Sequence, residues 1–260
     1  LHTGTKVHIS KNYLNGIRTK KDDYLRLLKS DDVYLIGLVA GNITRKKFGK
    51  KVSFVNNIIL NYTNVCITDC KFCAFYRPPN HEEAYTLTLD EIEARVKTGW
   101  DMFKIRQVLI QGGHNPKLGI EYYEDSFKMI RSKFPMVGVH GLSTSETDMI
   151  ATVEKSSTKE ILSRLKDAGL QSVPGGGAEI LTDSVKEIIS PKKIDSDDWI
   201  RIMKESFELG LPASATLMYG HVETDNDIVE HYDKIAKLQK DLNGFMAFIP
   251  WSFEPNNTLM

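Results

Sequence analysis

Residues 55–73 read VNNIILNYTNVCITDCKFC. The start of this stretch is rich in aliphatic and β-branched side chains and predicts a β-strand over 55–61. Cys66, Cys70 and Cys73 follow the strand in the spacing C-x3-C-x2-C, and the sequence contains no other cysteine. An odd, tightly clustered set of cysteines argues against a disulfide framework and predicts metal binding in a reducing compartment.

The cysteine spacing also indicates the kind of metal site. Three thiolates this close in sequence can hold three irons of a [4Fe–4S] cluster and leave the fourth iron without a protein ligand. Chelation of that open iron by S-adenosylmethionine is the known use of this geometry. We therefore predict a [4Fe–4S] cluster on Cys66, Cys70 and Cys73, with S-adenosylmethionine as the second cofactor.

Three alternatives use the same cysteines differently. His81 as a fourth ligand would complete a structural Cys3His zinc site. A cluster that only carries electrons normally takes four cysteines, and this sequence has three. Inert buried cysteines would rarely show this spacing. A zinc site would make the chain a noncatalytic, metal-stabilised binding module, which metal analysis would distinguish from an enzyme.

Beyond this stretch, short apolar runs alternate with amphipathic segments. The predicted strands cover 55–61, 107–111, 136–142, 171–173, 213–219 and 245–250. The predicted helices between them cover 89–97, 122–134, 146–168 (as one helix or two), 197–209 and 225–242. This alternation implies an α/β fold built from right-handed βαβ units. Six units favour a (β/α) barrel, full or partial, with its site at the C-terminal ends of the strands.

The chain divides into two predicted regions. Helical periodicity over 21–28 and 32–45 predicts an N-terminal helical segment, residues 1–52, before a barrel core of residues 53–260. An eight-stranded barrel would require two further strand–helix units after residue 260.

Bulk composition limits the partners. Lys plus Arg and Asp plus Glu both number 34, so the formal net charge is zero and nothing favours a nucleic-acid or acidic-membrane partner. No apolar run approaches the roughly 20 residues that span a bilayer. No apolar signal segment begins the sequence, so we expect a cytoplasmic location.

Two glycine segments lie at predicted strand ends. Gln111-Gly112-Gly113 would let the backbone approach a ligand closely, and a tight turn needs the same residues. A proline and three glycines, residues 174–177, precede Glu179, whose carboxylate would bond a ribose or a substrate; the alternative is a flexible loop with a solvated Glu179. A side chain at Gly176 would fill space and would be strained if φ there is positive.

Polar residues end other strands. His140 ends the third strand, where a hydrogen-bonded packing histidine is the common alternative to a substrate contact. His221 and Glu223 follow the fifth strand at i, i+2 spacing, which suits substrate-facing or proton-transfer groups.

Three further residues are predicted to line the substrate site. Tyr62 and Asn64 end the first strand and would form the floor. Trp251, after residues 249–250, would form an apolar wall that keeps water out, although core packing also explains a tryptophan there.

These motifs resemble those of the radical S-adenosylmethionine enzymes of menaquinone and deazaflavin biosynthesis, over residues 52–259. The matching segments are residues 61–66 (NYTNVC), 70–77 (CKFCAFYR), 111–113 (QGG), 174–180 (PGGGAEI), 189–193 (ISPKK), 220–224 (GHVET) and 248–251 (FIPW). Tyr76 and residues 249–251 make the chain most similar to the cyclic dehypoxanthine futalosine synthases within that group.

The resemblance implies roles for particular residues. It implies a radical SAM barrel that cyclises dehypoxanthine futalosine through hydrogen abstraction by a 5′-deoxyadenosyl radical, with a flavodoxin- or ferredoxin-like reductant. His221 or Glu223 would act as the base. The implied cofactor contacts are Phe72, Tyr76, Gln111, Gly112, Gly113, Gly176 and Glu179. Aminofutalosine synthase or a deazaflavin synthase subunit would share the cofactor chemistry with a different substrate.

Overall fold

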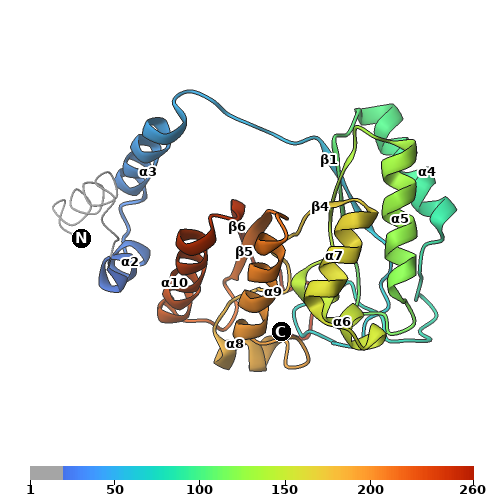
Figure 1. Cartoon of the computed structure of the whole chain (residues 1–260). Coiled ribbons are helices and arrows are strands. Elements are labelled where there is room, and N and C mark those ends of the chain that lie inside the picture. Colours follow the sequence, from blue (N-terminus) through green and yellow to red (C-terminus); the bar gives the residue numbers. More distant parts are fainter. Residues whose placement is uncertain (1–19) are drawn as a thin grey trace.

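The computed structural model describes residues 20–260, in which strands and helices alternate along most of the chain (Figure 1). The strands are β1 (Asn57–Asn61), β2 (Gln107–Gln111), β3 (Gly138–Gly141), β4 (Leu170–Ser172), β5 (Ala213–Tyr219) and β6 (Phe245–Ser252). The helices are α2 (Lys21–Leu28), α3 (Val33–Phe48), α4 (Leu89–Phe103), α5 (Ile120–Lys133), α6 (Thr144–Glu154), α7 (Thr158–Ala168), α8 (Asp183–Ile189), α9 (Ser196–Glu208) and α10 (Asp225–Leu242).

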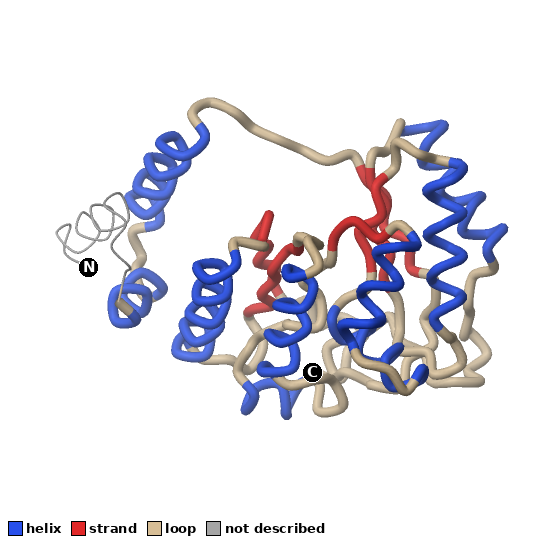
Figure 2. The backbone as a smooth tube through the Cα atoms, in the orientation of Figure 1, coloured by secondary structure: helices blue, strands red, loops and turns tan. Residues whose placement is uncertain are grey.

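The strands form one parallel system. β1 to β4 pair in chain order, and β5 pairs with β6, all in parallel. A parallel bridge between Val173 and Ala213 continues the pairing from the end of β4 to the start of β5. The helices lie outside the strands (Figure 2). Within residues 20–260, β1 and β6 do not pair with each other, so the predicted (β/α) barrel is confirmed in its partial form.

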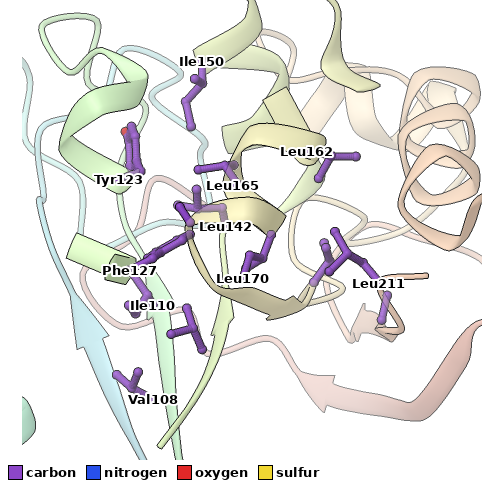
Figure 3. Close-up of a cluster of buried hydrophobic side chains, with 14 of the residues drawn as sticks. Val108, Ile110, Tyr123, Phe127, Leu142, Ile150, Leu162, Leu165, Leu170 and Leu211 are labelled. Carbon is purple, nitrogen blue, oxygen red and sulfur yellow. The ribbon is translucent and has the colours of Figure 1, made fainter. Parts of the chain in front are cut away.

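The core lies between the sheet and the helices packed on it. Val108 and Ile110 alternate with half-buried residues along β2 and belong to the same core cluster as buried residues of α5. Figure 3 shows Phe127 of α5 and Leu165 of α7 in the same apolar cluster. Each side chain of this size contributes about 1.5–3 kcal/mol when fully buried, so this cluster fixes the strands that carry the site.

Helix ends follow the capping signals in the sequence. Thr88 and Glu91 form a capping box at the start of α4. The segment predicted as one helix or two over 146–168 is two helices, because Lys155 ends α6 in the left-handed conformation and Ser157 caps α7. The sequence prediction missed α8, since a seven-residue helix is too short to show periodicity.

Of the two N-terminal helices, α2 lies against the barrel and α3 lies away from it. α2 contacts α10, α3 buries none of its residues, and residues 49–56 run as an extended link to β1 (Figure 1). Residues 1–19 of the predicted N-terminal segment lie outside the described part of the chain, and the division at residue 52 stays a prediction. No helix among the described residues is long and apolar enough to cross a membrane.

Candidate active site

The three cysteines lie on the loop that follows β1, at the C-terminal edge of the sheet. Cys66 and Cys70 are buried and Cys73 is half-buried. The loop is held from two sides: the backbone N–H of Cys66 donates to the carbonyl of Arg77 at 2.9 Å, and that of Lys71 donates to Ile189 at 2.9 Å. Distant segments therefore set the shape of the loop.

The thiols converge within this loop. The Thr68 hydroxyl lies 3.1 Å from Cys66 Sγ and 3.5 Å from Cys70 Sγ. Burial raises the pKa of the Cys70 thiol, whereas the ammonium of Lys193 lowers it. The pKa of the Cys70 thiol is raised overall, and the Lys193 cation offsets part of the cost that burial imposes on the thiolate form needed for metal ligation.

The described residues do not form a single-metal site. No group of three histidine, cysteine, aspartate or glutamate side chains in residues 20–260 is close enough to hold one ion. His81 accepts a hydrogen bond at Nδ1 from the Glu83 backbone instead. The Cys3His zinc site and the cluster on the three cysteines both stay predictions at this point.

A buried ion pair stands beside the cysteines. Lys193 Nζ lies 2.9 Å from Glu179 Oε1, with 14% and 7% of the two side chains exposed. Burial opposes the charge on Lys193, but the Glu179 carboxylate and then Cys70 raise its pKa. Lys193 Nζ also lies 5.5 Å from the centre of the Phe72 ring, which places Phe72 over this pair.

The second carboxylate oxygen of Glu179 receives no hydrogen bond from the described residues. Glu179 Oε2 is buried, and no described residue donates a hydrogen bond to it. A buried carboxylate oxygen without a donor costs free energy unless a bound molecule supplies one. The residues therefore fit a polar cofactor, and the ribose or amino group of S-adenosylmethionine offers such donors.

Gly112 and Gly113 bring the β2 loop against the cysteine loop. An added Cβ on Gly113 would lie 2.2 Å from the carbonyl oxygen of Val65, and one on Gly112 would lie 2.8 Å from the Tyr62 ring. The Gly113 N–H donates to Thr63 O at 3.0 Å. These glycines therefore permit close backbone packing. The predicted cofactor contacts of Gln111, Gly112 and Gly113 stay predictions.

The β4 loop differs from expectation at Gly176. Gly177 has φ +84°, and an added Cβ there would lie 2.9 Å from Ser145 Cβ; on Gly175 it would lie 2.8 Å from the Ala215 backbone. Gly176 does not have positive φ, and a Cβ added to it would lie 3.5 Å from Ser143 Cβ, which is an ordinary contact. The lack of space for a side chain that was expected at Gly176 is therefore found at Gly175 and Gly177, and the positive φ is found at Gly177.

Glu146, which the sequence prediction missed, ties three loops together. Its Oε1 accepts from Tyr62 Oη and the Gly112 N–H, both at 2.9 Å, and its Oε2 accepts from the backbone and hydroxyl of Ser143. Tyr62 is consequently a buried anchor with its hydroxyl engaged. The Ser143–Glu146 capping-box spacing was the available sequence signal.

Asn64 and His140 also bond to protein groups. Asn64 accepts from the Tyr85 N–H at 2.8 Å and donates to Glu83 O at 2.9 Å, so both ends of its amide hold the next loop. His140 Nδ1 lies 2.7 Å from the Ser172 hydroxyl, and burial lowers the pKa of His140 to about 4. Their predicted substrate contacts stay predictions.

The structure brings His221 and Glu223 together. His221 Nδ1 lies 3.2 Å from Glu223 Oε2, and the same oxygen accepts the His221 backbone N–H at 2.8 Å. The Nδ1 contact is close in distance but poorly aligned for a hydrogen bond. Trp251 pairs in register with Met218 on β5 and is 42% exposed, so it does not pack in the core.

Tyr76 lies on a pocket next to the last cysteine. The pocket is lined by Cys73, Ala74, Tyr76, Arg77, Pro78, His81, Glu83, Asn257, Thr258 and Leu259. The Leu259 N–H donates to the Lys71 carbonyl at 2.8 Å, which brings the segment after β6 onto the cysteine loop.

The class of protein follows from this fold and cysteine loop together with the comparisons. The model of the Radical SAM superfamily matches residues 60–235, more than half of the chain. The fold is similar to that of solved structures of a maturase of the [FeFe]-hydrogenase (TM-score 0.76, 18% identity, 98% of this chain and 56% of that one) and of methylornithine synthase (TM-score 0.74, 13% identity, 96% and 69%). The chain therefore belongs to the Radical SAM superfamily, whose cofactors are a [4Fe–4S] cluster and S-adenosylmethionine.

Several named relatives are similar to this chain in sequence. It is 38% identical over 253 residues to cyclic dehypoxanthine futalosine synthase of Halalkalibacterium halodurans (97% of this chain, 68% of the relative). It is 34% identical over 250 residues to aminodeoxyfutalosine synthase of Thermus thermophilus (96% and 67%). It is 37% identical over 226 residues to 5-amino-6-(D-ribitylamino)uracil–L-tyrosine 4-hydroxyphenyl transferase of Methanopyrus kandleri (87% and 61%). The chain thus spans about two thirds of the length of these relatives.

Proposed function

We propose that this chain is the radical SAM core of an enzyme that cyclises dehypoxanthine futalosine in menaquinone biosynthesis. The observation that carries the proposal is the 38% identity to cyclic dehypoxanthine futalosine synthase across 97% of the chain. Tyr76 and residues 249–251, which favour the cyclase in the sequence, support the same substrate.

Two groups of residues in this chain bind the cofactors. When bound, the cluster and S-adenosylmethionine supply a 5′-deoxyadenosyl radical that removes a hydrogen atom from the substrate, with the electron coming from a flavodoxin- or ferredoxin-like protein. Cys66, Cys70 and Cys73 hold the cluster. Glu179, fixed by Lys193, orients S-adenosylmethionine through its free oxygen.

The pair His221–Glu223 supplies the acid–base function. After the substrate radical adds to the aromatic ring, the closed-shell product forms by loss of one electron, which returns to the redox system that supplied it, and of one proton, which needs an acceptor within hydrogen-bond reach. His221 Nδ1 and the Glu223 carboxylate stand 3.2 Å apart after β5, at the edge of the sheet where the cysteines lie. Glu223 Oε2 also accepts the backbone N–H of His221, which holds the two side chains beside each other.

Aminodeoxyfutalosine synthase chemistry is the second candidate, because a relative of that name is 34% identical over 96% of the chain.

The cyclase proposal is tested by incubating anaerobically reconstituted protein with S-adenosylmethionine, dithionite and dehypoxanthine futalosine and analysing the products by mass spectrometry. A cyclic product of dehypoxanthine futalosine is expected. Release of 5′-deoxyadenosine without any change in dehypoxanthine futalosine would reject the cyclase proposal.

A further inference from the structure

Lys186 on α8 is a buried lysine that faces the β4 loop. Only 3% of the residue is exposed, and its ammonium donates to the carbonyl oxygens of Gly177 at 3.0 Å and Ala178 at 3.3 Å. No carboxylate of residues 20–260 lies within ion-pair distance of it. Burying an unpaired ammonium is costly, so the fold places this charge against the loop at the expense of stability.

The loop that Lys186 holds has an unfavourable backbone. Gly177 has φ +84° and Glu179 has φ +43°, a left-handed conformation that costs a residue with a Cβ about 1 kcal/mol or more. The Met218 N–H donates to the Glu179 carbonyl at 2.7 Å and holds the far side of this turn. Lys186 holds the near side, through the two carbonyls before Glu179.

We propose that Lys186 is a positioning residue that sets the turn at residues 177–179 and so presents the free oxygen of Glu179 to S-adenosylmethionine. Glu179 Oε2 is buried without a donor, and its orientation depends on the backbone torsions that Lys186 stabilises. This inference rests on the proposed assignment of Glu179 to the cofactor site. It does not depend on which substrate the enzyme cyclises.

The first test uses the iron-free protein and hydrogen exchange. Lys186→Met keeps the chain length of lysine and removes the charge and donors, so amides of residues 177–179 should exchange about tenfold faster. Lys234→Met is the matched control: Lys234 Nζ donates to the Leu181 carbonyl at 2.7 Å, in the same loop but beyond Glu179. Unchanged exchange at residues 177–179 in the Lys186 variant would overturn the proposal.

The second test is a double-mutant cycle on S-adenosylmethionine affinity, measured at equal iron content in Glu179→Gln, Lys186→Met and the double variant. Each single change should weaken binding about tenfold, and the double variant should bind no more weakly than Glu179→Gln. Lys234→Met should bind as the wild type does. If Lys186→Met does not fold, Lys186→Gln replaces it, because its amide keeps a donor for one of the two carbonyls.

The positioning role of Lys186 and the assignment of Glu179 to the cofactor site fail in different ways. Additive losses, or a Lys186 variant with normal affinity and only a lower unfolding temperature, would reject the positioning role. Unchanged affinity in Glu179→Gln would reject the cofactor assignment of Glu179 and the inference with it. Formation of cyclic product by the wild-type protein tests the proposed function independently.

Discussion

At the scale of single residues, the site combines groups whose chemistry depends on burial. The buried Lys193 ammonium lowers the pKa of Glu179 and so favours its carboxylate, whereas burial outweighs the same ammonium at Cys70 and raises the pKa of that thiol. Glu179 Oε1 contacts Lys193, and Glu179 Oε2 is buried without a hydrogen-bond donor among the described residues.

Replacing any one of Cys66, Cys70 and Cys73 by alanine should abolish cluster assembly, because two thiolates do not hold the cubane. Iron and sulfide analysis after anaerobic reconstitution measures the effect. Lys71→Ala changes an exposed side chain of the same loop and should keep the wild-type iron content. A cysteine variant that retains full iron and releases 5′-deoxyadenosine would disprove the ligand assignment.

His221→Ala and Glu223→Gln should uncouple cofactor cleavage from product formation. If the pair handles the substrate proton, cyclic product falls by about 10²-fold or more while 5′-deoxyadenosine continues to form. The ratio of the two products, at equal cluster loading, is the measurement. Glu230→Gln on α10 is the control. A wild-type ratio in both site variants would make the pair structural.

At the scale of elements, the strand-end loops interlock. The β2 loop packs on the cysteine loop through Gly113, and the carboxylate of Glu146 at the start of α6 holds Tyr62 and Gly112 on one oxygen. Because each loop packs against the backbone of another, a substitution in one loop should alter the conformation of the cysteine loop.

Gly113→Ala should destabilise the iron-free protein by roughly 1–3 kcal/mol and lower cluster loading, since the new Cβ would meet Val65 O at 2.2 Å. Denaturant unfolding and iron content measure both effects. Gly37→Ala in α3 has open space around the new Cβ and should raise helix stability by about 1 kcal/mol at most. Equal stability of the Gly113 variant and wild type would contradict the packing role.

At the scale of the whole molecule, buried neutral histidines link folding to pH. Burial lowers the pKa of His114 to about 3, of His140 to about 4 and of His231 to about 3. The unfolded chain binds protons at these positions below about pH 6.5, whereas the folded protein does not. The stability they contribute is therefore present above pH 6.5 and is lost as the pH falls towards 4.

Unfolding free energy should fall as the pH is lowered from 6 to 5, by roughly 1.4 kcal/mol per pH unit for each buried histidine. The His231→Gln variant should show a slope that is smaller by about 1.4 kcal/mol per pH unit, whatever the stability of the variant at neutral pH. Urea unfolding of the iron-free protein at several pH values measures the slope, and His81→Gln, at an exposed position, is the control. An unchanged slope in His231→Gln would show that His231 is charged in the folded protein.

The sequence by itself determined the strand order and most helix positions, because these depend on local signals; the cluster ligands are predicted from an equally local signal. Apolar periodicity predicts β2, β5 and α10 with the bounds that the structure shows, and the cysteine spacing lies within eight residues. Capping boxes predict helix starts for the same reason, since a cap involves residues three positions apart.

Only the tertiary structure decided which polar groups meet at the strand ends. Lys193 reaches Glu179 across 14 positions within the segment between β4 and β5. Glu146, after β3, reaches Gly112, after β2, across 34 positions. Local periodicity carries no information on such contacts, and it does not distinguish Gly177, which has positive φ, from Gly176, which does not. Burial, backbone torsion and the charge of neighbours arise from packing between segments, so the arrangement of Lys186, Glu179 and Lys193 became visible only in the folded chain.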